Sequence, residues 1–290
     1  MGCYTAIDVS RYQGEIDWAA AARETDLAIL RVGYRGSSSG SLIRDSRLER
    51  NRAGCEAQKL PWGVYVYSQS MTQAEAREEA RWAWSALEGA KHANGWVAFD
   101  MEDFYSGRTK GMSKAKRTAA ARAFCEEVQR LGGQPLIYGS YGQLPSFFDL
   151  EELKDCPFWV ARYDRNDNGR PTELAHTLAV GETWLWQYSS KGKVSGIRGY
   201  VDKNQLFVSP VHRQAGKTDD YPAPTRNLCE GTRGEDVKWL QSALNGRGAD
   251  LSVDGIFGPL TDQAVRTYQK ANGLTVDGIV GPKTRAALIA

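Results

Sequence analysis

The sequence has 290 residues, of which 41% are hydrophobic and 10% aromatic, a composition that supports one large packed domain or a large domain with a small one. The formal net charge of +2 and the absence of a long Lys/Arg tract argue against a nucleic-acid partner. The longest apolar runs have the length of strands, so we expect no membrane span and no membrane partner.

Strand-like and helix-like segments alternate from residue 4 to residue 207. Strands are predicted by short apolar or alternating runs over residues 4–10, 27–34, 61–68, 96–102, 135–140, 158–163, 184–189 and 200–207. Helices are predicted between them over residues 15–25, 43–58, 72–90, 113–131 and 147–154. This alternation indicates an α/β fold with a parallel sheet, and eight strands favour a closed barrel whose last quarter lacks full helices. An open doubly wound sheet is the alternative, although no glycine-rich phosphate loop follows the first strand.

The fourth predicted strand ends in the carboxylates Asp100, Glu102 and Asp103. Because a strand alternates its faces, Asp100 and Glu102 should point the same way. Two like charges on one face of a sheet do not stabilise a fold, so the stretch is either an ordinary solvated strand end or a catalytic pair. In a pair, burial and mutual repulsion separate the two pKa values, and we expect the pKa of Glu102 to be raised so that it stays protonated near neutral pH.

Two further acids should lie near this pair. Asp8 ends the first predicted strand and Asp202 lies in the eighth, and these strands are neighbours in a closed barrel. Four carboxylates at one mouth, without His or Cys partners, suit cleavage of a glycosidic bond, which needs a protonated acid and a nearby negative charge. A divalent cation site is the alternative, which the lack of a matching phosphate binder disfavours.

Aromatic residues fall in or at the ends of the same strands. Aromatic rings with polar tips suit the flat C–H faces and polar rims of sugars, although any one of them alone is typical of core packing. As a set they predict a saccharide groove. The candidate substrate-binding residues are Tyr34, Tyr65, Tyr67, Tyr138, Trp159, Tyr163 and Trp186.

The cysteines and the N-terminus bear on the compartment. The five cysteines (Cys3, Cys55, Cys125, Cys156 and Cys229) are odd in number and form no CxxC pair, and the three histidines are scattered. This argues against a disulfide framework or a zinc site, so we expect free thiols, no metal and no cofactor. The first residues carry neither the basic segment nor the apolar stretch of a signal peptide, which predicts synthesis in the cytoplasm. The oligomeric state is left open.

The chain changes character after residue 207. Residues 208–226 contain three prolines and no periodic pattern, which indicates a linker. Residues 227–290 form a separate module with an internal repeat, because Asp-Gly-Ile-Phe-Gly-Pro-Leu-Thr at 254–261 recurs as Asp-Gly-Ile-Val-Gly-Pro-Lys-Thr at 277–284. Each copy predicts a glycine turn followed by a helix with Pro in its first turn, and the whole predicts a small three-helix domain.

Together, these residues resemble glycoside hydrolase family 25, the lysozymes with a flattened, irregular barrel. The resemblance covers roughly residues 3–207 and rests on residues 8–14, 63–67, 99–102, 186–188 and 199–204. The module at 227–290 resembles the three-helix peptidoglycan-binding domain of wall hydrolases. The expected organisation is a catalytic barrel over 1–207, a linker over 208–226 and a wall-binding domain over 227–290.

The resemblance implies hydrolysis of the β-1,4 bond between N-acetylmuramic acid and N-acetylglucosamine in peptidoglycan, with retention of configuration. Glu102 would be the general acid, and Asp100 would act either as nucleophile or by orienting the substrate's 2-acetamido group. Asp8 and Asp202 would shape the charge of the site. The family usually has a His between the two aromatic residues of the third strand, where this chain has Val66, so any role of that His is absent.

The organisation also looks like that of a phage endolysin, which waits in the host cytoplasm until a holin opens the membrane and then acts on the cell wall. A non-catalytic protein that binds cell-wall saccharides is the alternative function. The intact Asp100 and Glu102 pair favours the enzyme.

Overall fold

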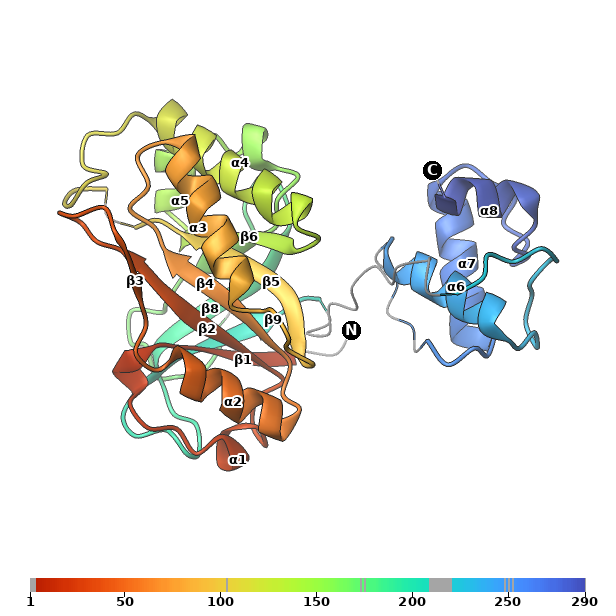
Figure 1. Ribbon diagram of the computed structural model, residues 1–290, viewed down its shortest axis with the longest axis horizontal. Helices are drawn as coiled ribbons and strands as arrows, with labels where there is room; N and C mark the ends of the chain where they lie inside the picture. Colours follow the sequence, from red (N-terminus) through yellow and green to blue (C-terminus); the bar gives the residue numbers. More distant parts are fainter. Residues whose placement is uncertain are drawn as a thin grey trace. The chain divides into compact units, whose positions relative to one another are not determined.

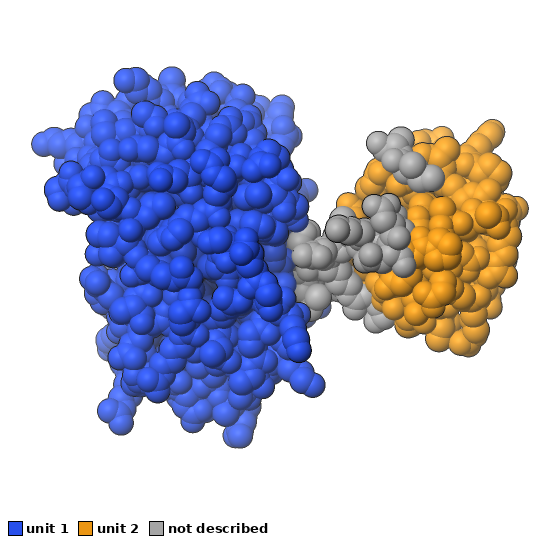
Figure 2. Space-filling model, viewed as in Figure 1, with its two compact units in different colours: residues 1–212 blue, residues 213–290 orange. Residues whose placement is uncertain are grey.

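The computed structural model describes residues 4–102, 104–172, 174, 176–208, 221–247, 249, 251 and 253–289. The chain divides into two compact units, residues 1–212 and 213–290 (Figure 1; Figure 2). Residues 209–220 of the predicted linker, together with Cys3 and Asp103, lie outside the described residues.

The first unit is a closed barrel of eight strands (Figure 1). The order around the ring is β1-β9-β8-β7-β6-β5-β4-β2, and pairing of β1 with β2 closes it, which confirms the predicted barrel. A ninth strand, β3 (Leu42–Arg44), pairs only with β2, so it is an extension outside the ring. The ring strands are β1 (Tyr4–Val9), β2 (Leu27–Arg35), β4 (Trp62–Tyr67), β5 (Ala93–Asp100), β6 (Gln134–Ser140), β7 (Phe158–Ala161), β8 (Thr183–Gly192) and β9 (Val201–Leu206).

The ring strands that lie beneath helices bury both faces, and the two faces meet different cores. In β5, Val97 and Phe99 belong to the core that includes helix residues, whereas Trp96 and Ala98 belong to a core made of strand residues inside the barrel. This alternation follows from the two-residue period of a strand. Asp100 continues the inward series at the end of β5, so the interior of the barrel changes from apolar to acidic at that end.

Among the described residues of this unit, five helices and two short 3₁₀ turns connect the strands. Thr72 caps α3 by accepting from the backbone N–H of Glu75 (3.2 Å), as the spacing of the two residues predicts. Helices α3 and α4 pack against each other (Figure 1). The elements are η1 (Arg11–Gln13), α1 (Trp18–Ala21), α2 (Leu48–Gln58), α3 (Gln73–Ser85), α4 (Lys114–Arg130), α5 (Gln143–Phe147) and η2 (Glu151–Leu153).

Two predicted helices are shorter than expected. The segment predicted to be helical over 15–25 forms only the single turn of α1, and the segment predicted over 43–58 becomes helical at Leu48. Residues 42–44 instead add to the exposed edge of β2 as β3. Backbone pairing with a neighbouring strand therefore overrides a helix-like local pattern in this segment.

The prediction of an all-parallel sheet is wrong for the last strand. β9 runs antiparallel to both of its neighbours, β8 and β1. The short connection between β8 and β9 allows a hairpin-like return but holds no crossover helix, which a parallel pair would need. The beginning of β9 consequently lies at the same end of the barrel as the end of β1.

No helix among the described residues is long and apolar enough to cross a lipid bilayer. The four cysteines within the described ranges are free, and three of them, Cys55, Cys125 and Cys156, are buried. These thiols therefore serve as small apolar core groups.

The second unit contains α6 (Glu235–Asn245), α7 (Pro259–Ala271) and α8 (Pro282–Ile289). The three helices surround a core of their own, which includes Leu240, Phe257 and Val265. Each copy of the sequence repeat leads into one helix, α7 or α8, with proline as its first residue. The predicted three-helix domain is thus confirmed.

A buried glutamine closes the first repeated turn. Gln241 on α6 is only 2% exposed, and its Nε2 donates to Asp254 Oδ1 (2.8 Å) and to the carbonyl of Ile256 (3.0 Å). Its Oε1 accepts from the backbone N–H of Gly255 (2.9 Å). Gly255 has a φ of +76°, which explains why glycine follows the aspartate.

The second copy repeats this arrangement. Gln269 on α7 is 1% exposed and donates to Asp277 Oδ1 (2.8 Å) and to the carbonyl of Ile279 (3.0 Å), while it accepts from the N–H of Gly278 (3.0 Å). In both copies the helix before the turn supplies the glutamine. The Asp-Gly motifs are therefore structural elements that tie each turn to the preceding helix.

Candidate active site

One end of the barrel opens into a cavity of about 310 Å³. The cavity contains all four predicted carboxylates and five of the seven predicted aromatic residues. Its lining consists of Asp8, Ser10, Tyr12, Gln13, Arg31, Tyr65, Tyr67, Asp100, Glu102, Tyr138, Trp159, Tyr163, Gln187 and Asp202.

The sheet brings the carboxylates together. β1 and β9 pair with Asp8 directly opposite Asp202, which confirms that these two residues lie side by side. Asp100 is the last residue of β5, and Glu102 follows two positions later. Acids from the first, middle and last parts of the barrel therefore share one mouth.

Asp8 is held by two amides. The residue is 6% exposed, and its Oδ2 accepts from Gln187 Nε2 (2.8 Å) and Asn204 Nδ2 (2.9 Å). Burial raises the pKa of Asp8 to about 6, and the nearby charge of Glu102 contributes to the rise. The two hydrogen bonds act in the opposite direction and lower the pKa. Asp8 is thus ionised at neutral pH but takes up a proton under mildly acidic conditions.

Asp100 and Glu102 form a coupled pair. Asp100 is 4% exposed, and burial, the charge of Glu102 and a hydrogen bond with Glu102 together raise the pKa of Asp100 well above its usual range. The pair therefore holds a proton at neutral pH. Asp100 Oδ1 is buried and makes no hydrogen bond among the described residues, so this acceptor is available for a bound molecule.

Asp202 completes the acidic cluster. Burial is the main reason that the pKa of Asp202 rises to about 8, and the charges of Asp8 and Glu102 raise it further. The cation in the lining is Arg31, whose Nε donates to Asp45 (2.8 Å) and whose charge lowers the pKa of Asp100. The mouth therefore carries fewer negative charges at neutral pH than its four acids suggest.

The aromatic lining is joined to the same polar framework. Tyr138 donates its hydroxyl proton to Gln187 Oε1 (2.8 Å), and Tyr163 donates to the same oxygen. Trp159 Nε1 donates to Asn204 Oδ1 (2.7 Å), and the rings of Tyr138 and Trp159 meet edge to face with centroids 4.6 Å apart. The two amides that bond to Asp8 thus also fix the rings beside it.

Comparison with known proteins identifies the family. Residues 7–197 match the family model for glycosyl hydrolases family 25, and residues 233–288 match a peptidoglycan binding domain. The chain belongs to glycoside hydrolase family 25. Its relatives include the autolytic lysozyme of Clostridium acetobutylicum, 27% identical over 97% of this chain and 77% of that protein.

Solved structures share the fold. The spore cortex lytic enzyme SleM of Clostridium perfringens superposes with a TM-score of 0.60 at 17% identity, covering 70% of this chain and 67% of SleM. The catalytic domain of endolysin ply40, from a bacteriophage of Listeria monocytogenes, gives 0.56 at 21% identity, covering 73% of this chain and 97% of that domain. The family membership and the lysozyme relatives make this protein a glycoside hydrolase of the muramidase type that acts on peptidoglycan.

Two predicted substrate-binding residues of this family 25 enzyme do not line the cavity. Trp186 lies on the opposite face of β8 from Gln187, where its ring stacks on His176 (4.5 Å) and its Nε1 donates to the carbonyl of Arg162 (2.9 Å). Tyr34 lies beyond a register shift in β2 and pairs with Ile43 of β3. Strand alternation excludes the first, and an irregularity in the strand displaces the second.

The sequence analysis missed the two amides and Arg31. Gln187 and Asn204 are buried polar residues that bond to Asp8, and both lie within motifs that carried the family resemblance. The two-residue period of a strand is the signal that could have found them, because it places Asn204 on the same face as the predicted acid Asp202 and Gln187 on the same face as Leu185. Arg31 gave no comparable signal, because an arginine in a strand is usually a surface residue.

A second buried network supports the mouth of this enzyme from behind. Glu79 on α3 is fully buried, accepts from Arg35 Nε (2.7 Å) and Ser68 Oγ (2.6 Å), and has a pKa that burial raises to about 7. The backbone N–H of Ser68 in turn donates to the carbonyl of Asp100 (2.6 Å). The network thereby anchors the end of β5 that carries the acidic pair.

Within the described residues, no group of three or more His, Cys, Asp or Glu side chains is arranged to hold a metal ion.

The raised pKa of Asp202 predicts a stability that falls with pH. The folded enzyme keeps this proton up to about pH 8, whereas the unfolded chain loses it in the usual acidic range of an aspartate, so stability falls as pH rises between these values. Asp202→Asn should raise the melting temperature at pH 8 by about 2–4 °C, the shift that roughly 1 kcal/mol produces in a domain of this size, and should have little effect at pH 4. Melting curves across this range measure the difference, with the exposed Asp155→Asn as control. A lower melting temperature of Asp202→Asn at pH 8 would contradict the assignment.

Proposed function

We propose that this muramidase hydrolyses the β-1,4 bond between N-acetylmuramic acid and N-acetylglucosamine with retention of configuration. The observation that carries the proposal is the coupled Asp100–Glu102 pair at the end of β5, in which buried Asp100 makes a hydrogen bond with half-buried Glu102. A pair in hydrogen-bond contact leaves no room for a water between its carboxyl groups, and an inverting mechanism needs that water.

Glu102 is the general acid in this proposal. It gives its proton to the leaving glycosidic oxygen as the bond breaks, and the resulting carboxylate later takes a proton from the water that completes hydrolysis. Ionised Asp8 then lies near the positive charge that develops on the sugar ring. Half-buried Tyr65 and Tyr67 supply aromatic walls of the cavity against the pyranose faces, while buried Trp159 packs behind them.

Asp100 orients the substrate in this proposal and does not attack it. With the shared proton on Glu102, Asp100 is a carboxylate that is only 4% exposed, which leaves it little access to the anomeric carbon. Its buried Oδ1 makes no hydrogen bond among the described residues and is suited to accept from an amide N–H. The substrate's own 2-acetamido oxygen is the nucleophile that attacks the anomeric carbon, and Asp100 holds the acetamido N–H. Attack by this neighbouring group followed by attack of water retains the configuration.

Removing the acid tests the central assignment. Glu102→Gln should lower kcat by roughly 10²–10⁴-fold, the usual contribution of a general acid. The measurement is release of reducing ends from purified peptidoglycan, with a melting curve to show that the fold persists. Glu88→Gln, which makes the same change on an exposed residue, should be fully active. Activity of Glu102→Gln close to that of the unchanged enzyme would exclude this role.

The stereochemistry tests the role of Asp100. Proton NMR during hydrolysis of a β-linked oligosaccharide should show the β-anomer as the first product. If the acetamido group is the nucleophile, an oligosaccharide without the N-acetyl group on its muramic acid residues should resist cleavage. An α-anomer as first product would refute retention, and rapid cleavage of the de-N-acetylated substrate would refute acetamido participation.

The second unit has a targeting role in this proposal, and the whole chain acts as a phage endolysin. The support is the combination of a family 25 barrel with a peptidoglycan-binding unit, together with the fold shared with the ply40 catalytic domain. The enzyme accumulates in the host cytoplasm and reaches the wall after a holin opens the membrane. Bacterial cells that express the chain alone should keep their turbidity, whereas cells that also express a holin should lyse. Lysis without a holin would contradict the cytoplasmic stage.

A further inference from the structure

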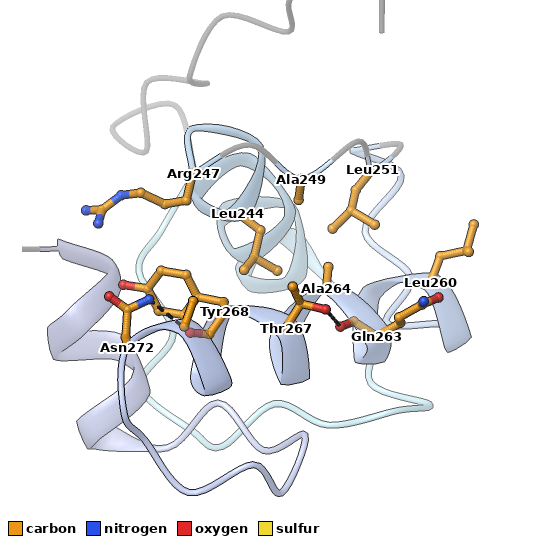
Figure 3. A pocket seen from close by; sticks show the side chains of 11 residues that line it. Leu244, Arg247, Ala249, Leu251, Leu260, Gln263, Ala264, Thr267, Tyr268 and Asn272 are labelled. Carbon is orange, nitrogen blue, oxygen red and sulfur yellow. Dashed lines mark hydrogen bonds between the residues drawn. The ribbon is translucent and has the colours of Figure 1, made fainter. Parts of the chain in front are cut away.

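The second unit has a groove between α6 and α7 that no part of the barrel chemistry uses. The cavity measures about 540 Å³ and lies between the end of α6, residues 249 and 251, and one side of α7 (Figure 3). Leu244 and Leu251 line one wall, and Leu260 and Ala264 on α7 line the other. The accessible apolar surface of the groove is thus formed by exposed Leu260 and partly exposed Ala249 and Ala264, because Leu244 and Leu251 are largely buried in the core.

One end of the groove is polar. Arg247, Tyr268 and Asn272 lie together at this end, opposite the end formed by Leu251 and Leu260 (Figure 3). Tyr268 donates its hydroxyl proton to the carbonyl of Ala287 (2.6 Å), and Asn272 Nδ2 donates to the carbonyl of Tyr268 (2.9 Å). These donors are already engaged, so they offer little to a ligand.

Arg247 is the charged residue among the described lining residues. It is exposed, and one of its N–H groups donates to the carbonyl of Leu288 (3.2 Å). A guanidinium has five donor N–H groups in a planar fork, so the remaining ones can bind a carboxylate. The groove therefore combines a long apolar surface with a single site for an anion at one end.

This chemistry suits a peptide better than a sugar chain. Sugars pack on open aromatic faces, but the ring in this lining, Tyr268, is only 8% exposed. Peptidoglycan consists of glycan chains and short peptides rich in L- and D-alanine that carry free carboxylates. Alanine methyl groups match the leucine and alanine walls, and a terminal carboxylate matches Arg247.

We propose that the groove binds the peptide of peptidoglycan, with its C-terminal carboxylate on Arg247 and its alanine methyl groups against Ala249, Leu260 and Ala264. The proposal rests on the wall-targeting role of the second unit. In this proposal the barrel binds the glycan and the second unit binds the peptide, so the two units do not compete for the same part of the wall.

Amide chemical shifts of the full chain test this directly, because they report on the groove separately from the barrel. The probes are a synthetic alanine-containing wall tetrapeptide that ends in D-alanine, the same peptide with a C-terminal amide, and peptide-free glycan chains. The chain carries Glu102→Gln so that the glycan stays intact. The free-acid peptide should shift the amides of Ala264, Thr267 and Leu251, and the amidated peptide should bind about tenfold more weakly or worse, as expected for the loss of one charge-assisted interaction.

Variants locate the anion site. Arg247→Gln should weaken peptide binding by about tenfold or more, whereas Arg247→Lys, which keeps a cation, should restore part of the affinity. Lys270→Gln removes the same charge from an exposed position of α7 outside the groove and should bind as well as the parent. Unchanged shifts of the core amides around Phe257 show that each variant is folded.

Three outcomes overturn the proposal. If peptide-free glycan shifts the groove amides and the peptide does not, the second unit still binds the wall, but through the sugar. If the peptide binds equally well to the parent and to Arg247→Gln, Arg247 does not bind the peptide's carboxylate. If neither probe shifts any amide of the second unit, and the chain also fails to sediment with peptidoglycan, the targeting role fails together with this proposal.

Discussion

The burial of several carboxylates in one cavity is the constraint on which the active end of the barrel depends. Each acid loses hydration, and each negative charge raises the cost of the next. Two features offset this cost. Gln187 and Asn204 both donate hydrogen bonds to Asp8, and the raised pKa values of Asp100 and Asp202 let the Asp100–Glu102 pair and Asp202 hold protons. Gln187 and Asn204 do more than replace the water around Asp8, because each also accepts a hydrogen bond from an aromatic residue of the lining. The charge of the site and the position of its walls are therefore set by the same two side chains.

Apolar burial in the rest of the barrel offsets the free-energy cost of these buried acids. The outward faces of most strands pack beneath the helices in one core, and the inward faces pack on one another in a second core with Trp96, Trp159 and Leu185. Burial of one such large apolar side chain contributes about 1.5–3 kcal/mol, which is comparable with the cost of one poorly solvated polar group. Beyond the inner core, Glu79 and Ser68 hold the carbonyl of Asp100 from the side of α3. The acidic end of β5 is thus fixed from inside and outside the barrel, which keeps the coupled pair in contact.

Sequence patterns predicted which strands exist and which acids meet, but not every direction and register. The eight barrel strands were recognisable because apolar runs and turn signals are local features, and Asp8, Asp100, Glu102 and Asp202 follow from strand ends and barrel closure. The direction of β9 depends on how a short connection folds back, which no periodicity records. The sequence predicts that Trp186 binds substrate, but its neighbour Gln187 is the residue that faces the cavity. A two-residue period reveals that a strand alternates its faces but not which face points inward. Tyr34 was misplaced for another reason, since the register shift between Arg31 and Gly33 becomes visible only once β2 is paired with β4.

The second unit shows why a repeated motif can mark structure while the function lies elsewhere. Gln241 and Gln269 hold the two Asp-Gly turns by equivalent hydrogen bonds, so selection for a stable turn is enough to explain the repeat. The groove does not follow this symmetry. The sequence between α6 and the first turn, residues 246–253, is longer than residues 272–276 before the second, and it supplies Arg247, Ala249 and Leu251 to the groove. The longer segment thus contributes lining residues to the groove while both glutamine-bonded turns are kept. Leu251 belongs to the core and its backbone is held by Asn245, whereas Arg247 is exposed and holds neither repeated turn. A change of Arg247 would therefore alter the charged end of the groove and leave both turns in place.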